Sequence, residues 1–95
     1  MGIKYEIRYH EAAVKEDIPR LSSEWKKRIK TAIEVRLSSL PDLYGKPLRR
    51  SLKGYRKLRV GDYRVIFRIE GKTVKIFIIG HRSVVYARAE GRLLA

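Results

Sequence analysis

The segment at residues 54–69, GYRKLRVGDYRVIFRI, most constrains the fold, because it reads as two β-strands joined at Gly61-Asp62. A two-residue hairpin loop that begins with glycine fixes how the flanking strands pair. The predicted pairs are Val60 with Tyr63, Arg59 with Arg64, Leu58 with Val65 and Lys57 with Ile66. The chain should therefore contain an antiparallel sheet with a defined register.

The predicted hairpin has one apolar face and one cationic face, because side chains alternate along a strand. The apolar face holds Leu58, Val60, Tyr63, Val65 and Phe67. The opposite side, here called the basic face, holds Lys57, Arg59, Arg64 and Arg68. Two arginines directly opposite each other destabilise a sheet. We therefore expect an anionic ligand on the basic face.

A second turn at Gly71-Lys72 extends this sheet to a third strand over residues 73–80. The same counting pairs Glu70 with Thr73, Ile69 with Val74, Phe67 with Ile76 and Val65 with Ile78. It continues the apolar face across three strands and adds Lys75, Phe77, Ile79 and His81 to the basic face. Cations beside an aromatic ring suit a surface that holds both phosphates and bases.

The N-terminal half predicts a strand over residues 4–9 and two helices. The first helix begins near Glu11 and ends or kinks at Pro19. Ser22 should cap the second, which Pro41 ends. Its apolar stripe is Trp25, Ile29, Ile33, Leu37 and Leu40. We expect the pair to cover the apolar face of the sheet, although its basic side would also suit a nucleic-acid groove.

The rest of the chain predicts a basic loop over residues 41–54 and a short C-terminal helix or tail from about Ser83, which Gly91 weakens. The fold class is therefore α+β, with a helical hairpin packed on an antiparallel sheet. The length of 95 residues suits a single domain, residues 1–95.

Charge is the strongest global signal, because 23 Lys and Arg residues against 10 Asp and Glu residues give a net charge of +13. This excess favours a polyanionic partner: nucleic acid, the ribosome, anionic lipid or an acidic protein. No stretch approaches the ~18 apolar residues of a membrane span. Among these polyanions we expect nucleic acid, the ribosome or an acidic protein as the partner, and no membrane. The absence of cysteine rules out disulfides and fits a cytoplasmic protein. With His10 and His81 as the only histidines, we expect no metal site and no cofactor.

The usual catalytic motifs are absent: there is no glycine-rich phosphate loop, no HExxH and no Ser-His-Asp set with support on both sides. What remains is a cluster of Lys, Arg, Tyr and one His. Such a set can promote phosphoryl transfer in RNA, because the substrate supplies its own 2′-hydroxyl nucleophile and the protein must orient it. Cations then stabilise the charge of the transition state.

Three segments resemble the RelE/ParE toxin superfamily of type II toxin–antitoxin systems: GKPLRR at 45–50, the hairpin at 54–69 and IIGHRSVVY at 78–86. The order of elements agrees, and the resemblance covers roughly residues 5–86. It implies a RelE-like fold and a metal-independent mRNA interferase. Such a toxin cuts mRNA in the ribosomal A site, contacts ribosomal RNA, leaves a 2′,3′-cyclic phosphate and is neutralised by a RelB-like antitoxin.

The resemblance also implies roles for individual residues. Lys57 matches a proposed general base, and Arg64 matches the arginine that stabilises the transition state. Arg82 matches an arginine that assists the leaving 5′ oxygen, and Tyr86 matches a tyrosine that stacks on or orients the base.

Further contacts to RNA phosphates are expected from Lys53, Arg59, Arg68 and His81. Some relatives use a nearby histidine as acid or base, so the general acid stays open between Arg82 and His81. Two other functions also stay open. ParE-type members share the fold but poison DNA gyrase without cutting RNA, and the domain could instead be a plain RNA- or ribosome-binding module.

Overall fold

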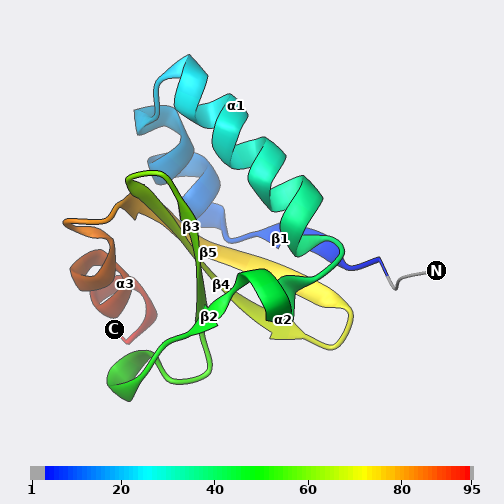
Figure 1. Ribbon diagram of the computed structural model, residues 1–95. Helices are drawn as coiled ribbons and strands as arrows, with labels where there is room; N and C mark the ends of the chain where they lie inside the picture. Colours follow the sequence, from blue (N-terminus) through cyan, green and yellow to red (C-terminus); the bar gives the residue numbers. More distant parts are fainter. Residues whose placement is uncertain (1–3, 95) are drawn as a thin grey trace.

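The computed structural model describes residues 4–94, so the ends of the predicted domain, residues 1–3 and 95, lie outside the described residues. Within this range the chain forms a five-stranded sheet in the order β1-β5-β4-β3-β2 (Figure 1). The strands are β1 (Glu6–Tyr9), β2 (Lys46–Pro47), β3 (Arg56–Val60), β4 (Tyr63–Glu70) and β5 (Thr73–His81). Strand β1 pairs parallel with β5, and the other pairs are antiparallel. The predicted α+β fold is confirmed.

Two helices form the predicted hairpin on one side of the sheet (Figure 1). The first spans residues 11–20, with Pro19 in its final 3₁₀ turn. The second is α1 (Ser23–Ala32), which continues into a π-helical turn, Ile33–Leu37. Ser22 is its N-cap, since the Ser22 Oγ accepts the backbone N–H of Trp25 at 3.3 Å.

The apolar stripe of this helix is buried at three of its five predicted members, and Trp25 is half-buried. Ile29, Ile33 and Leu37 are 2%, 1% and 0% exposed, whereas Leu40 is 51% exposed. The prediction for Leu40 was wrong, because the helix ends at Leu37. The predicted loop that follows contains α2 (Pro41–Tyr44), β2 and a 3₁₀ turn, Arg50–Leu52.

The register of the central hairpin is confirmed at every predicted pair, including Arg59 opposite Arg64. Gly61 has φ of +58° and Asp62 has no positive φ, the pattern of a type II′ turn. A Cβ at Gly61 would also lie 2.6 Å from the Trp25 ring. Glycine is therefore required both by the turn and by the packing of α1 on its tip.

Strand β5 contains a β-bulge at Phe77, which corrects the predicted register. Phe67 pairs with Ile76 as predicted, but Ile66 pairs with Ile78, and Val65 pairs with Ile79 instead of Ile78. One extra residue moves every later side chain to the other face.

Two residues predicted on the basic face consequently lie on the apolar face. Ile79 packs in the core beneath the helical hairpin. His81 pairs with Tyr63, and their ring centres lie 5.7 Å apart. The prediction that Ile79 and His81 share the face of Lys57 and Arg64 was therefore wrong.

The sheet is covered on both sides, which gives the molecule two apolar cores. The larger core lies between the sheet and the helical hairpin and includes Phe67 and Ile76. The smaller one lies beneath the C-terminal helix α3 (Val85–Leu93), where Val85 and Ala89 meet Ile66 and Ile78. The predicted C-terminal helix thus forms despite Gly91, and it covers part of the basic face (Figure 1).

No helix within residues 4–94 has both the length and the apolar character needed to cross a membrane.

Candidate functional site

Three of the predicted site residues line one pocket at the outer part of the sheet. This cavity of about 170 Å³ is lined by Tyr44, Lys46, Lys57, Arg59 and Arg64. Lys57 and Arg59 alternate along β3 with the buried Leu58 and Val60, so both point away from the larger core. Arg64 joins them from β4, directly opposite Arg59. We call this cavity the β3–β4 pocket.

The cations of this pocket are not neutralised by the protein, and one of them is held by the backbone. The Arg64 Nη1 donates hydrogen bonds to the carbonyl oxygens of Gly61 and Tyr63, both at 2.9 Å. Among the ion pairs of residues 4–94, none includes Lys57, Arg59 or Arg64. The pocket therefore presents cations that the protein itself does not neutralise, as an anion-binding site requires.

Tyr86 lies beside this pocket, on the second residue of α3. Its ring centre is 5.5 Å from the Lys57 Nζ, within cation–π range. The neighbouring Val85 is fully buried in the smaller core and fixes this turn of the helix. The structure thus brings together Lys57, Arg59, Arg64 and Tyr86 from three elements.

The helix that carries Tyr86 is fastened by a buried carboxylate that sequence reasoning missed. Asp17 is 1% exposed and accepts hydrogen bonds from the Ile79 backbone N–H at 2.9 Å and from Arg88 and Arg92, both at 2.7 Å. The hydrogen bonds that Arg92 donates to the Asp17 carboxylate are the main cause that raises the pKa of Arg92. We call this set the Asp17 clamp. Its one signal in the sequence is an aspartate two residues before Pro19, near the end of the first predicted helix.

Two other predicted residues lie at the tip of the central hairpin, outside the β3–β4 pocket. The Arg82 side chain is exposed, with its Nε 3.9 Å from the Asp62 Oδ1, and its backbone N–H donates to the Asp62 carbonyl at 2.8 Å. The His81 Nδ1 lies 2.8 Å from the Ser83 Oγ and 3.2 Å from its backbone nitrogen, which closes a local turn.

Arg68 and Lys53 also lie away from the pocket. The Arg68 guanidinium is 5.6 Å from the Tyr55 ring centre, and its Nε is 3.8 Å from Glu70. Lys53 is exposed in the turn that follows Leu52.

Tyr44 and Lys46 are the pocket residues that sequence reasoning did not select. These two residues line the pocket because β2 pairs with β3, which places Lys46 opposite Lys57. Arg56 supports this connection by donating a hydrogen bond to the Gly45 carbonyl at 2.8 Å. The segment GKPLRR carried the only signal, as part of the resemblance.

The chemistry of the assembled site is cationic and phenolic. Among residues 4–94, no three His, Cys, Asp or Glu side chains are placed to hold a metal ion. Guanidinium and ammonium groups bind phosphate oxygens and stabilise charge that develops on them.

The fold and the site define a toxin of the RelE/ParE superfamily. Residues 7–86 match the family described as "ParE toxin of type II toxin-antitoxin system, parDE". This match covers most of the chain, and the protein belongs to that family.

Individual relatives agree with this assignment. Toxin RelG of Mycobacterium tuberculosis is 44% identical over 54 residues, a match that spans 55% of this chain and 62% of that protein. The RelBE2 toxin–antitoxin complex of the same organism contains a chain that is 32% identical, with a TM-score of 0.79, covering 85% of this chain and 94% of that one. The RelB–RelE complex of Methanococcus jannaschii contains a chain that is 29% identical, with a TM-score of 0.64. The match covers 80% of this chain and 91% of that one.

Proposed function

We propose that this toxin is a ribosome-dependent mRNA endoribonuclease that inhibits translation. The observation that carries the proposal is the convergence of Lys57, Arg59 and Arg64 in the β3–β4 pocket, with Tyr86 beside Lys57. These cations have no carboxylate partner within the described residues, and the pocket is small enough to hold one phosphodiester group. The partners are mRNA in the ribosomal A site and ribosomal RNA.

The reaction is an attack of the ribose 2′-oxygen on the adjacent phosphorus. The bond between O2′ and phosphorus forms, and the bond from phosphorus to the 5′ oxygen breaks. The leaving 5′ oxygen takes up a proton to become a 5′-hydroxyl, and a 2′,3′-cyclic phosphate remains. Lys57 is the general base that takes the 2′-hydroxyl proton. Arg59 binds the phosphate, and Arg64 stabilises the charge of the transition state. None of these steps uses a metal ion.

Arg82 is the better choice for assisting the leaving 5′ oxygen. The Arg82 side chain is exposed, whereas His81 lies on the apolar face beside Tyr63. Arg68 and Lys53 are left for flanking phosphates, because both are exposed and cationic.

A RelB-like antitoxin is the proposed inhibitor. The matched structures from M. tuberculosis and M. jannaschii are complexes of toxin and antitoxin. The net charge of +13 favours an acidic partner for this chain.

Primer extension on mRNA from a translation extract tests the cleavage. The wild-type protein should give cuts spaced by codons, and Arg64→Ala should lower their rate by about 10²–10³-fold, the cost of losing one transition-state donor. Arg8→Ala is the matched control, because Arg8 is an exposed strand arginine on β1, at the opposite edge of the sheet. Full cleavage by the folded Arg64→Ala protein would remove Arg64 from the mechanism.

The second candidate function is the poisoning of DNA gyrase by binding. The description of the matching family, which names ParE, is the observation that favours it. A gyrase supercoiling assay run beside the extract separates the two functions. Blocked supercoiling without mRNA cuts would replace the nuclease proposal.

A further inference from the structure

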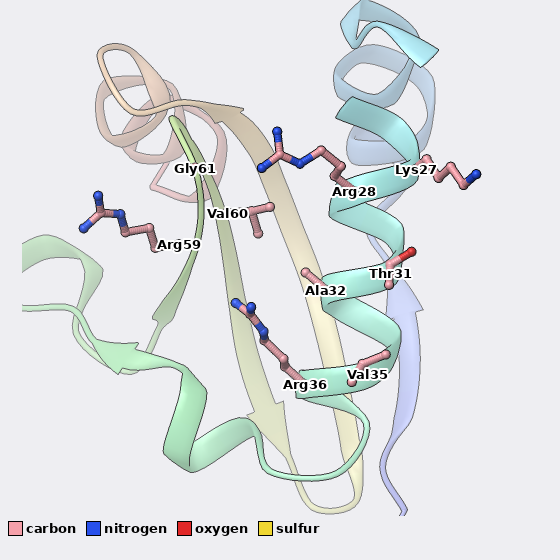
Figure 2. A pocket seen from close by; sticks show the side chains of 9 residues that line it. All are labelled: Lys27, Arg28, Thr31, Ala32, Val35, Arg36, Arg59, Val60 and Gly61. Carbon is pink, nitrogen blue, oxygen red and sulfur yellow. The ribbon is translucent and has the colours of Figure 1, made fainter. Parts of the chain in front are cut away.

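A second cationic cavity lies on the other side of β3 from the β3–β4 pocket. It has a volume of about 520 Å³ and opens between α1 and the tip of the central hairpin (Figure 2). We call it the α1–β3 cleft. Its lining residues are Lys27, Arg28, Thr31, Ala32, Val35, Arg36, Arg59, Val60 and Gly61. Figure 2 shows Arg28 and Arg36 reaching from the helix toward the strand, whereas Lys27 extends away from it.

The two helix arginines are held in place without being neutralised. The Arg28 guanidinium lies 4.4 Å from the Trp25 ring centre, and that of Arg36 lies 5.7 Å from the Tyr44 ring centre. Neither takes part in an ion pair among residues 4–94. Stacking on an aromatic ring limits the freedom of an arginine but leaves its charge available to an anion.

The cleft and the candidate site share one lining residue, Arg59. Its side chain extends from β3 on the side away from α1 (Figure 2). Strand β2 pairs with β3 only at Arg56 and Lys57 in the described part of the chain. The edge of β3 beyond Lys57 is consequently open, and a flexible polyanion can pass over it from one cavity to the other.

We propose that the α1–β3 cleft binds the sugar-phosphate backbone of the RNA strand next to the scissile phosphodiester. This inference rests on the proposed function, and it extends the substrate beyond the β3–β4 pocket. An RNA strand that leaves the pocket past Arg59 carries a charge on every nucleotide, which matches a row of unpaired cations. The Trp25 and Tyr44 rings are occupied by guanidinium groups, so the cleft contacts the backbone and is indifferent to base sequence.

Fluorescence anisotropy with a labelled RNA of about 12 nucleotides tests this site, since single-strand binding sites are of that length. All riboses carry 2′-O-methyl groups, so no cleavage occurs, and no ribosome is present. Arg28→Gln/Arg36→Gln should weaken binding about tenfold and reduce the slope of log affinity against log salt by about 1.4, the value for two lost phosphate contacts.

The matched control is Lys26→Gln/Lys30→Gln, which removes two charges from the same helix on its opposite side, beside an apolar groove. Because the arginines also contact aromatic rings, Thr31→Glu provides a second variant that places a negative charge in the cleft without touching those contacts. Circular dichroism and thermal unfolding establish that each variant is folded. Equal weakening in the cleft variants and the control would overturn the proposal, because the loss would then follow net charge alone.

A poly-glutamate peptide of similar charge tests the competing ligand. If this peptide binds the wild-type protein as tightly as RNA does and loses binding in the same variants, the cleft recognises acidic peptide, and the proposal is wrong. The cleavage assay tests the nuclease proposal independently of the RNA-binding assay. A protein that cuts mRNA while its cleft variants bind RNA normally refutes only the cleft, whereas cleft binding without cleavage refutes only the nuclease.

Discussion

At the scale of single residues, the opposed pair Arg59 and Arg64 is the central feature of the molecule. The sheet tolerates it because the Arg64 guanidinium donates to two backbone carbonyls near the turn, while Arg59 sits at the open edge between two cavities. The repulsion that remains is relieved when an anion binds between them. Under the proposed function, the pair is thus a site formed before binding, and the cost of the repulsion in the free protein would be recovered when the RNA phosphate binds.

Tyr86 provides a prediction at the same scale. We expect Tyr86→Ala to slow mRNA cleavage about tenfold, because base stacking on an aromatic ring contributes about 1–3 kcal/mol. Tyr86→Phe keeps the ring near Lys57 and should retain most of the rate. Single-turnover rates from primer extension compare the two variants. An equal loss in both would assign the effect to the phenol hydroxyl and contradict the stacking role.

At the scale of elements, the Asp17 clamp joins three parts of the chain that are far apart in sequence. One carboxylate receives donors from β5 and from α3 while belonging to the first helix. Arg92 also donates to the Phe77 carbonyl at 3.0 Å, at the bulge itself. The clamp therefore fixes the bulge and the position of α3 together.

Removing the charge of the clamp should be costly. We expect Asp17→Asn to lower the free energy of unfolding by about 3 kcal/mol, because Arg88 and Arg92 would lose their buried partner. Glu11→Gln, which removes an exposed carboxylate from the same helix, should change it by less than about 1 kcal/mol. Urea unfolding measures both variants, and hydrogen exchange should show faster opening of α3 in Asp17→Asn. Equal stability of the two variants would contradict this account of the clamp.

The register of the central hairpin was predictable, and so was that of the β4–β5 hairpin as far as Phe67 and Ile76, because two-residue loops leave little choice in how the flanking strands pair. The bulge was not, because residues 76–79 read IFII and give no alternation from which a shift could be detected. The burial of Ile66 and Ile78 beneath α3 was not predicted either. Counting residues from the turn shows which face a side chain is on, but it does not show what covers that face.

The candidate site also contains some residues that the sequence predicted and others that it did not. Lys57, Arg59 and Arg64 came together because they lie on one face of one hairpin, which periodicity alone predicts. Tyr44 and Lys46 depend on the pairing of β2 with β3, a contact between segments with no shared pattern. Asp17 was missed because its donors, Arg88 and Arg92, lie more than 70 positions away along the chain.

At the scale of the whole molecule, a small chain with a net charge of +13 remains folded by burying apolar side chains on both sides of one sheet. The burial of one titratable side chain couples the stability of this fold to pH.

Tyr9 should make the protein lose stability on the alkaline side. Burial, and secondly the nearby Glu34, raise the pKa of Tyr9 above its usual value of about 10. The fold favours the neutral phenol, so this contribution is complete below pH 10 and is lost as the pH rises through the folded pKa. Chemical unfolding of the wild type and of Tyr9→Phe between about pH 8 and 11 isolates it, since the lysines titrate in both. Parallel stability curves would contradict the prediction.

The open edge of β3 also affects whether this protein associates with itself. An exposed strand edge is a template onto which a second sheet can be added, and many proteins aggregate in this way. Two copies joined through this edge would bring their Arg59 side chains, and the cations of both cleft walls, against one another. The edge thus discourages self-association while it stays open to strands or chains of opposite charge.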